Sequence, residues 1–199
     1  MTVDPGGDHR TRPRRRGAAL DAAIFEATLD ELSERGYATL TMERVAERAR
    51  ASKASLYRRW PSRIELVIDA VRHAFPDPAS TPDTGSLRGD LLAALRLAAA
   101  QLAGPAGEAL RGVLSDVLRD PARTAEFRSR THGASITVMR EILDRAAKRG
   151  EIEASAITSR RLEAGPALLR QHFLFGSHPV ADDVIVEIVD DVLLALFAR

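Results

Sequence analysis

Residues 40–63 read LTMERVAERARASKASLYRRWPSR, and this stretch decides the fold. Thr41 and Ser52 can each accept a hydrogen bond from a backbone N–H as a helix N-cap. The first of the two helices has a small apolar face and should end near Ala49, three residues before the start of the second. The stretch therefore predicts two short helices on either side of a tight turn.

Helical patterns continue on both sides of this stretch. Apolar residues recur at helical spacing from about residue 17 to 35, and Gly36 predicts the end of that helix. Ser62 and Glu65 form a capping box that predicts the start of another helix, and the proline-rich segment 76–85 predicts a loop. Further helical periods cover about 91–102, 110–118, 134–150, 157–175 and 181–198, and Pro166 predicts a kink in the fourth of them. With no strand pattern, the predicted fold class is all-α.

The composition excludes several classes of protein. The 199 residues are 45% hydrophobic and 29% charged, which predicts a folded globular chain rather than a disordered one. There is no cysteine, which excludes disulfides, thiolate metal sites and a cysteine nucleophile. The longest purely apolar run, 192–198, is far too short to cross a membrane, and no secretory signal follows the N-terminal arginines. We therefore expect a cytoplasmic protein that does not contact membranes.

Positive charge is concentrated at the front of the chain. Residues 1–63 contain 13 Lys and Arg against 9 Asp and Glu, whereas residues 64–199 contain 16 against 19. Five arginines fall within residues 10–16, and such a block often contacts a polyanion. The alternative is a solvated tail with no partner.

The second short helix has the features of a helix that enters the major groove of DNA. Such a helix presents short or hydrogen-bonding side chains at its N-terminal end, where free backbone N–H groups can also meet phosphate. Leu56 should face inward, whereas Lys53 and Ser55 can face the bases, and Tyr57 suits a phosphate contact through its hydroxyl. Arg58 or Arg59 faces DNA, depending on the register. Thr41 and Ser52 have the alternative role of plain helix caps, and Trp60 is favoured as a packing residue.

Together these residues resemble the DNA-binding region of the TetR family of bacterial transcriptional regulators. The resemblance covers about residues 15–72, and it rests on Gly36, Tyr37, Thr41, Ala46, Ser52, Lys53, Ser55, Leu56, Tyr57, Trp60 and Ser62. The segment RAAKRGEI, residues 145–152, is similar to a recurring element of TetR-type ligand domains. The resemblance implies a basic arm (1–16), a three-helix helix-turn-helix DNA-binding domain (17–74) and a helical ligand-binding and dimerisation domain (75–199).

The resemblance also supports phosphate contacts from Thr41, Tyr57 and Arg63. The residues expected to contact DNA are Arg14, Arg15, Arg16, Thr41, Ser52, Lys53, Ala54, Ser55, Tyr57, Arg58, Arg59 and Arg63. Two positions depart from the family pattern. Arg50 stands where glycine is common, which predicts a slightly different turn, and Arg44 leaves the cap at Thr41 without the acidic partner of a capping box.

The last predicted helix has an apolar stripe that is wider than one intramolecular neighbour normally covers. This width predicts a helix-mediated homodimer. The expected interface residues are Val184, Ile185, Ile188, Val189, Val192, Leu193 and Leu196. The alternative is a terminal helix that is buried in the core of a monomer.

A cavity among the middle helices would hold a small molecule. Its expected lining residues are Leu114, Leu118, Phe127, Met139, Leu143, Leu168, His172 and Phe173, although core packing is the alternative role for most of them. Their apolar character predicts an apolar or amphipathic ligand, with Arg170, Gln171 or His172 as a polar anchor. The exact ligand and the operator sequence stay open.

No constellation of residues favours an enzyme. The five histidines lack the four-residue spacing of a helical zinc pair, and there is no phosphate-binding glycine loop or G-x-S-x-G turn. We expect neither a metal nor a cofactor. The favoured hypothesis is a homodimeric repressor that binds a palindromic DNA operator and releases it when a small molecule binds. The alternatives are an architectural or ligand-independent DNA-binding protein and, less favoured, a helical enzyme.

Overall fold

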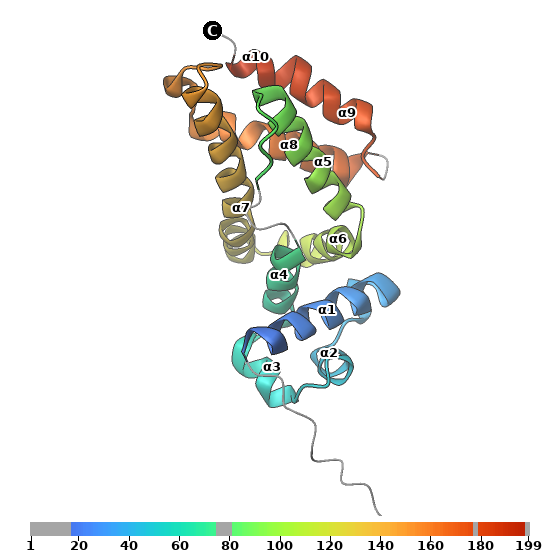
Figure 1. The fold of residues 1–199 in the computed structure, drawn as a ribbon. Coiled ribbons are helices and arrows are strands. Elements are labelled where there is room, and N and C mark those ends of the chain that lie inside the picture. The colour runs from blue at the N-terminus through green and yellow to red at the C-terminus, as the bar shows by residue number, and fades with distance from the viewer. Residues whose placement is uncertain (1–16, 75–80, 177–178, 198–199) are drawn as a thin grey trace, which may run out of the picture.

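The computed structural model describes residues 17–74, 81–176 and 179–197, which contain helices and no strand. The all-α prediction is therefore confirmed for this part of the chain. Figure 1 shows two tiers: α1 to α4 form an N-terminal head, and α5 to α10 form a C-terminal body above it. Within the described residues, no helix combines the length and the apolar character that crossing a membrane requires.

The head follows the caps and stops written in its sequence. Its helices are α1 (Ala18–Arg35), α2 (Met42–Arg48), α3 (Lys53–Arg59) and α4 (Arg63–Ala74), with the short 3-10 helix η1 (Tyr37–Thr39) after α1. Gly36 ends α1 with φ of 74°, a conformation that glycine adopts without strain. The hydroxyl of Ser62 accepts the backbone N–H of Glu65 at 3.3 Å, so the cap predicted for α4 forms.

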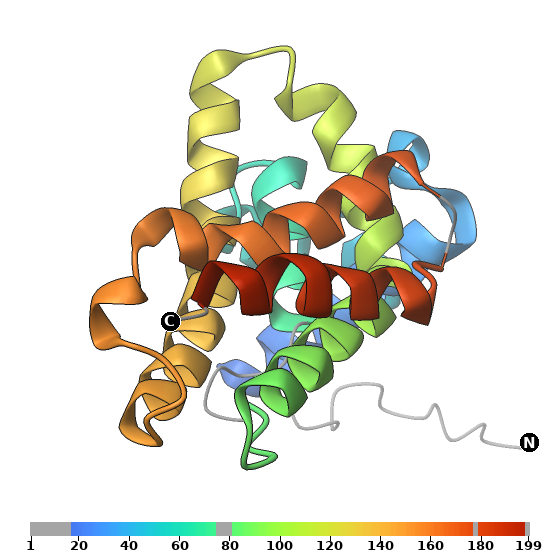
Figure 2. The same cartoon turned by 90° about the horizontal axis from the view of Figure 1, so that it is seen from above.

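The body consists of longer helices that cross one another, as the view from above in Figure 2 shows. They are α5 (Leu87–Leu102), α6 (Pro105–Val117), α7 (Pro121–Lys148), η3 (Ala154–Ala156), α8 (Ser159–Phe175), α9 (Asp182–Glu187), the π-helical segment η4 (Ile188–Leu193) and α10 (Leu194–Phe197). The last three follow one another without a break. Pro166 lies inside α8, which continues past it to Phe175.

Two hydrophobic cores form, and α6 belongs to both. Ala109 and Val113 of α6 are buried in the core of the head, whereas Leu110 of the same helix is buried in the core of the body. The contact with the head is close, because a Cβ atom at Gly112 would lie 2.2 Å from the Cβ of Tyr37. Packing therefore crosses the boundary that the sequence predicts near residue 74, since α6 completes the interior of the head.

Candidate DNA-binding surface and ligand cavity

The helices α2 and α3 begin at the predicted caps. The Thr41 hydroxyl accepts the backbone N–H of Arg44 at 3.3 Å, and the Ser52 hydroxyl accepts the backbone N–H of Ser55 at 3.2 Å. Both caps are exposed. Each therefore uses one lone pair for its helix and still lies at the surface, where a second hydrogen bond can form.

The turn between α2 and α3 has the left-handed residue that glycine usually supplies. Arg50 has φ of 53°, and the backbone N–H of Ala51 donates to the carbonyl of Ala46 at 2.8 Å. The C-terminus of α7 closes in the same way at Gly150, with φ of 78°. Arg50 therefore adopts the strained left-handed conformation, and the hydrogen bonds of the turn hold it there, while a slightly different turn from that of the family stays a prediction.

The inner face of α3 is held by packing. Leu56 is fully buried, and Trp60 is 5% exposed at the C-terminal end of the helix. The indole N–H of Trp60 donates to Asp69 on α4 at 3.0 Å, and its ring meets Phe25 of α1 edge to face at a centroid distance of 5.3 Å. The packing role predicted for Trp60 is confirmed. These contacts fix the direction in which the opposite face of α3 points.

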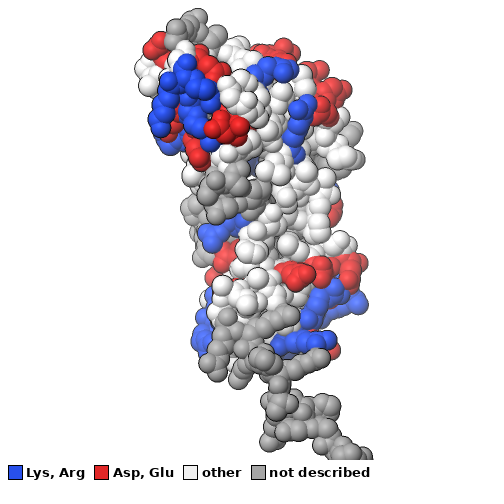
Figure 3. All heavy atoms as spheres, in the orientation of Figure 1, with Lys and Arg blue, Asp and Glu red and all other residues white. Residues whose placement is uncertain are grey.

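That opposite face presents side chains that suit DNA. Lys53, Ala54, Tyr57 and Arg58 are exposed, and the side chain of Lys53 is 62% accessible. Figure 3 shows side chains of both charge signs at the head and at the far end of the body. In this view the described residues of the head therefore form no unbroken basic field.

The structure adds a carboxylate to this surface that sequence reasoning missed. Glu43 on α2 accepts the Tyr57 hydroxyl at 3.4 Å, and its carboxylate lies 3.7 Å from the Lys53 Nζ. Glu43 lies in the first turn of α2, where a carboxylate also interacts favourably with the positive end of the helix. Packing of α2 against α3 brings Glu43 beside two residues that are expected to contact DNA.

Two of the residues expected to contact DNA have intramolecular partners. Arg59 pairs with Asp21 of α1 at 2.8 Å and donates to the Ser55 hydroxyl at 2.7 Å. Arg63 donates to the carbonyls of Tyr37 at 3.4 Å and Leu40 at 3.2 Å, and its guanidinium lies 4.3 Å from the centre of the Tyr37 ring. Both side chains are half-buried. Without DNA, Arg59 therefore joins α3 to α1, and Arg63 joins α4 to the segment before α2, while their contacts with DNA stay predictions.

The remaining DNA contacts stay predictions. Ser55 is half-buried and is already bonded to Arg59, so it is less available than Lys53 or Ala54. Arg14, Arg15 and Arg16 lie outside the described residues.

A cavity of about 230 Å³ lies in the body, next to the head. Helices α4, α5, α6, α7 and α8 all contribute to its wall. Of the residues predicted for a ligand site, Leu114, Phe127 and Met139 line it, as does Arg170 among the polar anchors. Val71 of α4 also lines it and is buried in the core of the head, so one side chain belongs to both.

Five residues predicted for the ligand site do not line this cavity. Leu143 and Phe173 are buried in the core of the body, Leu118 is 66% exposed, and Leu168 and His172 are half-buried elsewhere on α8. The sequence pattern could not separate these positions, because each has the apolar or aromatic character of a residue that faces the interior. The direction in which each side chain points depends on how the helices cross.

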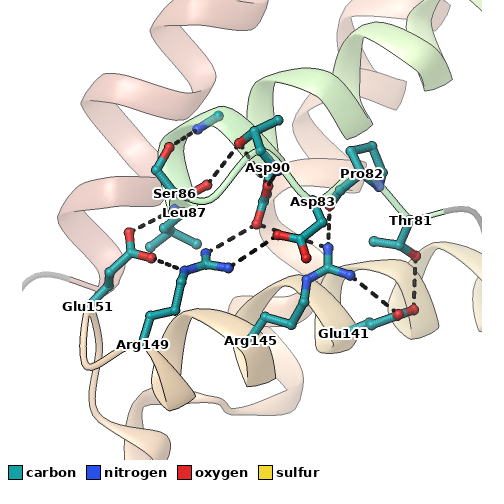
Figure 4. Close-up of polar contacts among 12 residues, drawn as sticks. Thr81, Pro82, Asp83, Ser86, Leu87, Asp90, Glu141, Arg145, Arg149 and Glu151 are labelled. Atoms are coloured by element: carbon teal, nitrogen blue, oxygen red, sulfur yellow. Dashed lines mark hydrogen bonds and ion pairs between the residues drawn. The ribbon is translucent and has the colours of Figure 1, made fainter.

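A network of hydrogen bonds and ion pairs joins α7 to the segment before α5, which forms part of the cavity wall (Figure 4). Thr81, which lines the cavity, donates to Glu141 at 2.9 Å, and Arg145 donates to the carbonyl of Pro82, the next lining residue. The carboxylate of Asp90, which is fully buried, accepts the backbone N–H of Thr84 at 2.6 Å and the guanidinium of Arg149 at 3.1 Å. Segment 145–152, which the sequence singled out, thus positions this wall.

The network also lowers the pKa values of two of its carboxylic acids, Asp90 and Glu151. Burial alone would raise the pKa of Asp90, but hydrogen bonds from Thr84 and Arg149 outweigh it and keep the pKa below its ordinary value. The pKa of Glu151 is lowered in the same way. Burial would raise it, but hydrogen bonds from the Leu87 backbone N–H and from Arg149 outweigh the effect of burial. Both carboxylates are therefore held as anions at neutral pH.

The last helix buries much of its wide stripe within its own chain. Ile185, Ile188, Val189 and Leu193 lie in the core of the body and are at most 4% exposed. Side chains buried in this way cannot contact a second chain, so these four assignments to a dimer interface are wrong. Val184, Val192 and Leu196 remain accessible, and Phe175 at the end of α8 is 81% exposed.

Comparisons with known proteins agree with this architecture. Residues 24–70 match the family described as "Bacterial regulatory proteins, tetR family", and residues 81–192 match "Tetracyclin repressor-like, C-terminal domain". An uncharacterized HTH-type transcriptional regulator of Mycobacterium tuberculosis is 35% identical over 179 residues, which are 90% of this chain and 88% of the relative. The DNA-binding transcriptional repressor TetR of Mycobacteroides abscessus is 31% identical over 91% of this chain and 95% of its own length.

A solved structure agrees as well. The crystal structure of the TetR family transcription regulator SCO0332 superposes with a TM-score of 0.72 at 27% sequence identity, over 90% of this chain and 99% of that one. These relatives are transcriptional regulators, which are not enzymes. The helix-turn-helix head, the helical body and both family matches lead to one conclusion: the chain is a DNA-binding transcriptional regulator of the TetR family.

Proposed function

We propose that this regulator is a homodimeric repressor that binds a palindromic operator and releases it when an apolar or amphipathic molecule enters the body cavity. The observation that carries the proposal is Val71, which is part of the head core and of the cavity wall. A ligand in the cavity contacts the helix that follows the DNA-binding surface. Occupancy can therefore favour one position of the head over another, by as much as the ligand's affinity differs between the two.

The division into an arm (1–16), a DNA-binding domain (17–74) and a ligand-binding and dimerisation domain (75–199) is part of this proposal. Two copies related by a two-fold axis would place their α3 helices about 34–36 Å apart, one turn of DNA. The protein would act in the cytoplasm, where its operator lies.

The accessible part of the last helix supports the dimer. Val192 is 37% exposed, and Phe175 of α8 is the most exposed large apolar side chain among those described. The two helices pack together where a Cβ atom at Gly165 would lie 2.9 Å from Leu193. A second copy would cover this apolar surface.

Charge insertion tests the dimer. Val192→Glu combined with Phe175→Glu should give a monomer in analytical ultracentrifugation, because two carboxylates would be buried without partners in the interface. Leu118→Glu is the matched control, since Leu118 caps the C-terminus of α6 and is 66% exposed, so this substitution should leave the mass unchanged. A dimer that persists in the double variant would place the interface elsewhere.

The function is tested by fluorescence anisotropy on DNA from upstream of the gene and its neighbours, against a scrambled duplex across a salt series. A repressor of these genes should bind one segment at least roughly 10³-fold more tightly than the scrambled duplex at equal salt. Equal and steeply salt-sensitive binding to both duplexes would favour an architectural role. Tight binding that no small molecule reverses would favour a ligand-independent regulator.

A further inference from the structure

The described lining of the body cavity contains two guanidinium groups and no carboxylate. Arg72 comes from the last turn of α4, and Arg170 comes from α8. Neither side chain makes an ion pair or hydrogen bond with any residue that the structure describes. Apart from Thr81 and Ser135, the remaining described lining residues are apolar.

This arrangement differs from that of other arginines in the body. Arg88 pairs with Asp190 at 2.7 Å, Arg96 pairs with Asp182 at 2.6 Å, and Arg149 pairs with Asp90 and Glu151. Arg170 is half-buried and faces a mainly apolar cavity, without such a partner among the described residues. A cation in these surroundings loses hydration without gaining a counter-charge, so an anion that enters the cavity is favoured.

We infer that the cavity binds an amphipathic monocarboxylate, with its apolar part among the leucines and its carboxylate at Arg170, where the guanidinium can bind it through two parallel hydrogen bonds. Arg72 supplies a second positive charge from the helix of the head. This inference rests on the proposed function, which makes this cavity the ligand site. A neutral ligand would leave both cations unpaired, and a cationic ligand would be repelled by them.

The volume limits the size of the ligand. About 230 Å³ lies just below the roughly 300–1,000 Å³ of common small-molecule pockets, which favours a medium-length apolar tail. A ten-carbon series is therefore a suitable probe. Decanoate, decan-1-ol and decylammonium share one tail and differ in the charge of the head group.

Isothermal titration calorimetry of the full-length protein at pH 7.5 with these three probes tests the charge preference. Decanoate should bind at least tenfold more tightly than decan-1-ol, and decylammonium should bind most weakly. Equal affinities for decanoate and decan-1-ol, tighter binding of decylammonium, or no binding of any probe would overturn the inference.

Substitutions of the two arginines test where the carboxylate of the ligand binds. Arg170→Gln should weaken decanoate binding at least fivefold and change decan-1-ol binding by less than twofold, and Arg72→Gln should have a smaller effect because Arg72 is exposed. The matched control is Arg160→Gln, on the same helix, because the Arg160 side chain is 90% exposed and pairs with Glu163 outside the cavity. Ala98→Phe, which fills the cavity, should abolish binding of all three probes. Circular dichroism confirms that each variant folds.

Operator release is measured separately, so that the two proposals can fail independently. Decanoate that binds through Arg170 but leaves operator affinity unchanged would support the ligand class and contradict ligand-controlled release. A neutral compound that releases the operator, with affinity that Arg170→Gln does not alter, would support release and contradict the ligand class.

Discussion

The head and the body each bury a carboxylate between arginines. In the head, Glu31 of α1 is 4% exposed, and its carboxylate lies 2.9 Å from Arg48 and 3.2 Å from Arg44 of α2. In the head, Lys53 and Arg58 stand exposed on α3, and the interior is closed by Leu56 and Trp60. In the body, Asp90 is fully buried and accepts a hydrogen bond from Arg149, which follows α7, while Arg145 of α7 donates to the cavity wall. The comparison teaches that the ion pairs of the head join neighbouring helices and leave residues that we expect to contact DNA exposed on α3, whereas the buried polar contacts of the body join distant segments and shape the cavity wall.

Removal of the buried Asp90 carboxylate of the body should give the largest effect on stability and would sharpen this comparison. Asp90→Ala leaves Arg149 and the Thr84 backbone N–H without their acceptor, so we expect a loss of about 3 kcal/mol in the free energy of unfolding. Urea unfolding followed by circular dichroism measures this loss. Asp144→Ala, at an exposed position of α7, is the control and should change stability little. A similar stability for Asp90→Ala would show that the network is not needed.

A substitution on the surface of the head should change DNA binding rather than stability. Lys53→Ala should weaken operator binding roughly tenfold or more without lowering the melting temperature, because we expect the exposed ammonium to contact DNA and not to support packing. Arg59→Ala is the counterpart: it breaks the pair with Asp21, so it should lower the melting temperature of the head. Fluorescence anisotropy and thermal melting of both variants measure these effects. A lower melting temperature for Lys53→Ala with unchanged operator binding would contradict the role expected for Lys53.

Acid should act on the body through Asp90. The pKa of Asp90 is lower in the folded protein than in the unfolded chain, so its contribution to stability is complete above the ordinary value near 4 and is lost as pH falls through the lowered one. Asn at this position does not titrate. The stability of wild type should therefore fall more steeply than that of Asp90→Asn from about pH 4 downward, and parallel unfolding curves would refute the lowered pKa.

The smallest effect concerns the turn of the head. Arg50→Gly should raise the free energy of unfolding by about 0.5–1 kcal/mol, because glycine removes the cost of the left-handed conformation but gains freedom in the unfolded chain. Arg50→Ala keeps that conformational cost and serves as the control. A destabilised Arg50→Gly variant would mean that the arginine side chain stabilises the turn by more than its backbone strain costs.

The ends of the helices could be predicted from local residues. Thr41, Ser52 and Gly36 act on backbone groups within a few positions of themselves, so the bounds of α1, α2 and α3 follow from short stretches of sequence. Local residues also identified the family, because residues 40–63 carry much of the resemblance to it. The partners of long side chains could not be predicted in this way: Arg59 and Asp21 are 38 positions apart and meet at 2.8 Å only after α1 and α3 pack.

The sequence by itself thus determined the helices, the all-α class and the face of α3 that is free to meet DNA, because periodicity and capping are properties of neighbouring residues. Only the tertiary structure decided which apolar side chains line the cavity and which are core, and that four of the seven stripe residues of the last helix lie inside their own chain. An apolar side chain leaves water equally well in a core, a cavity or an interface, so its identity alone cannot distinguish the three. The crossing of helices distant in sequence makes that choice.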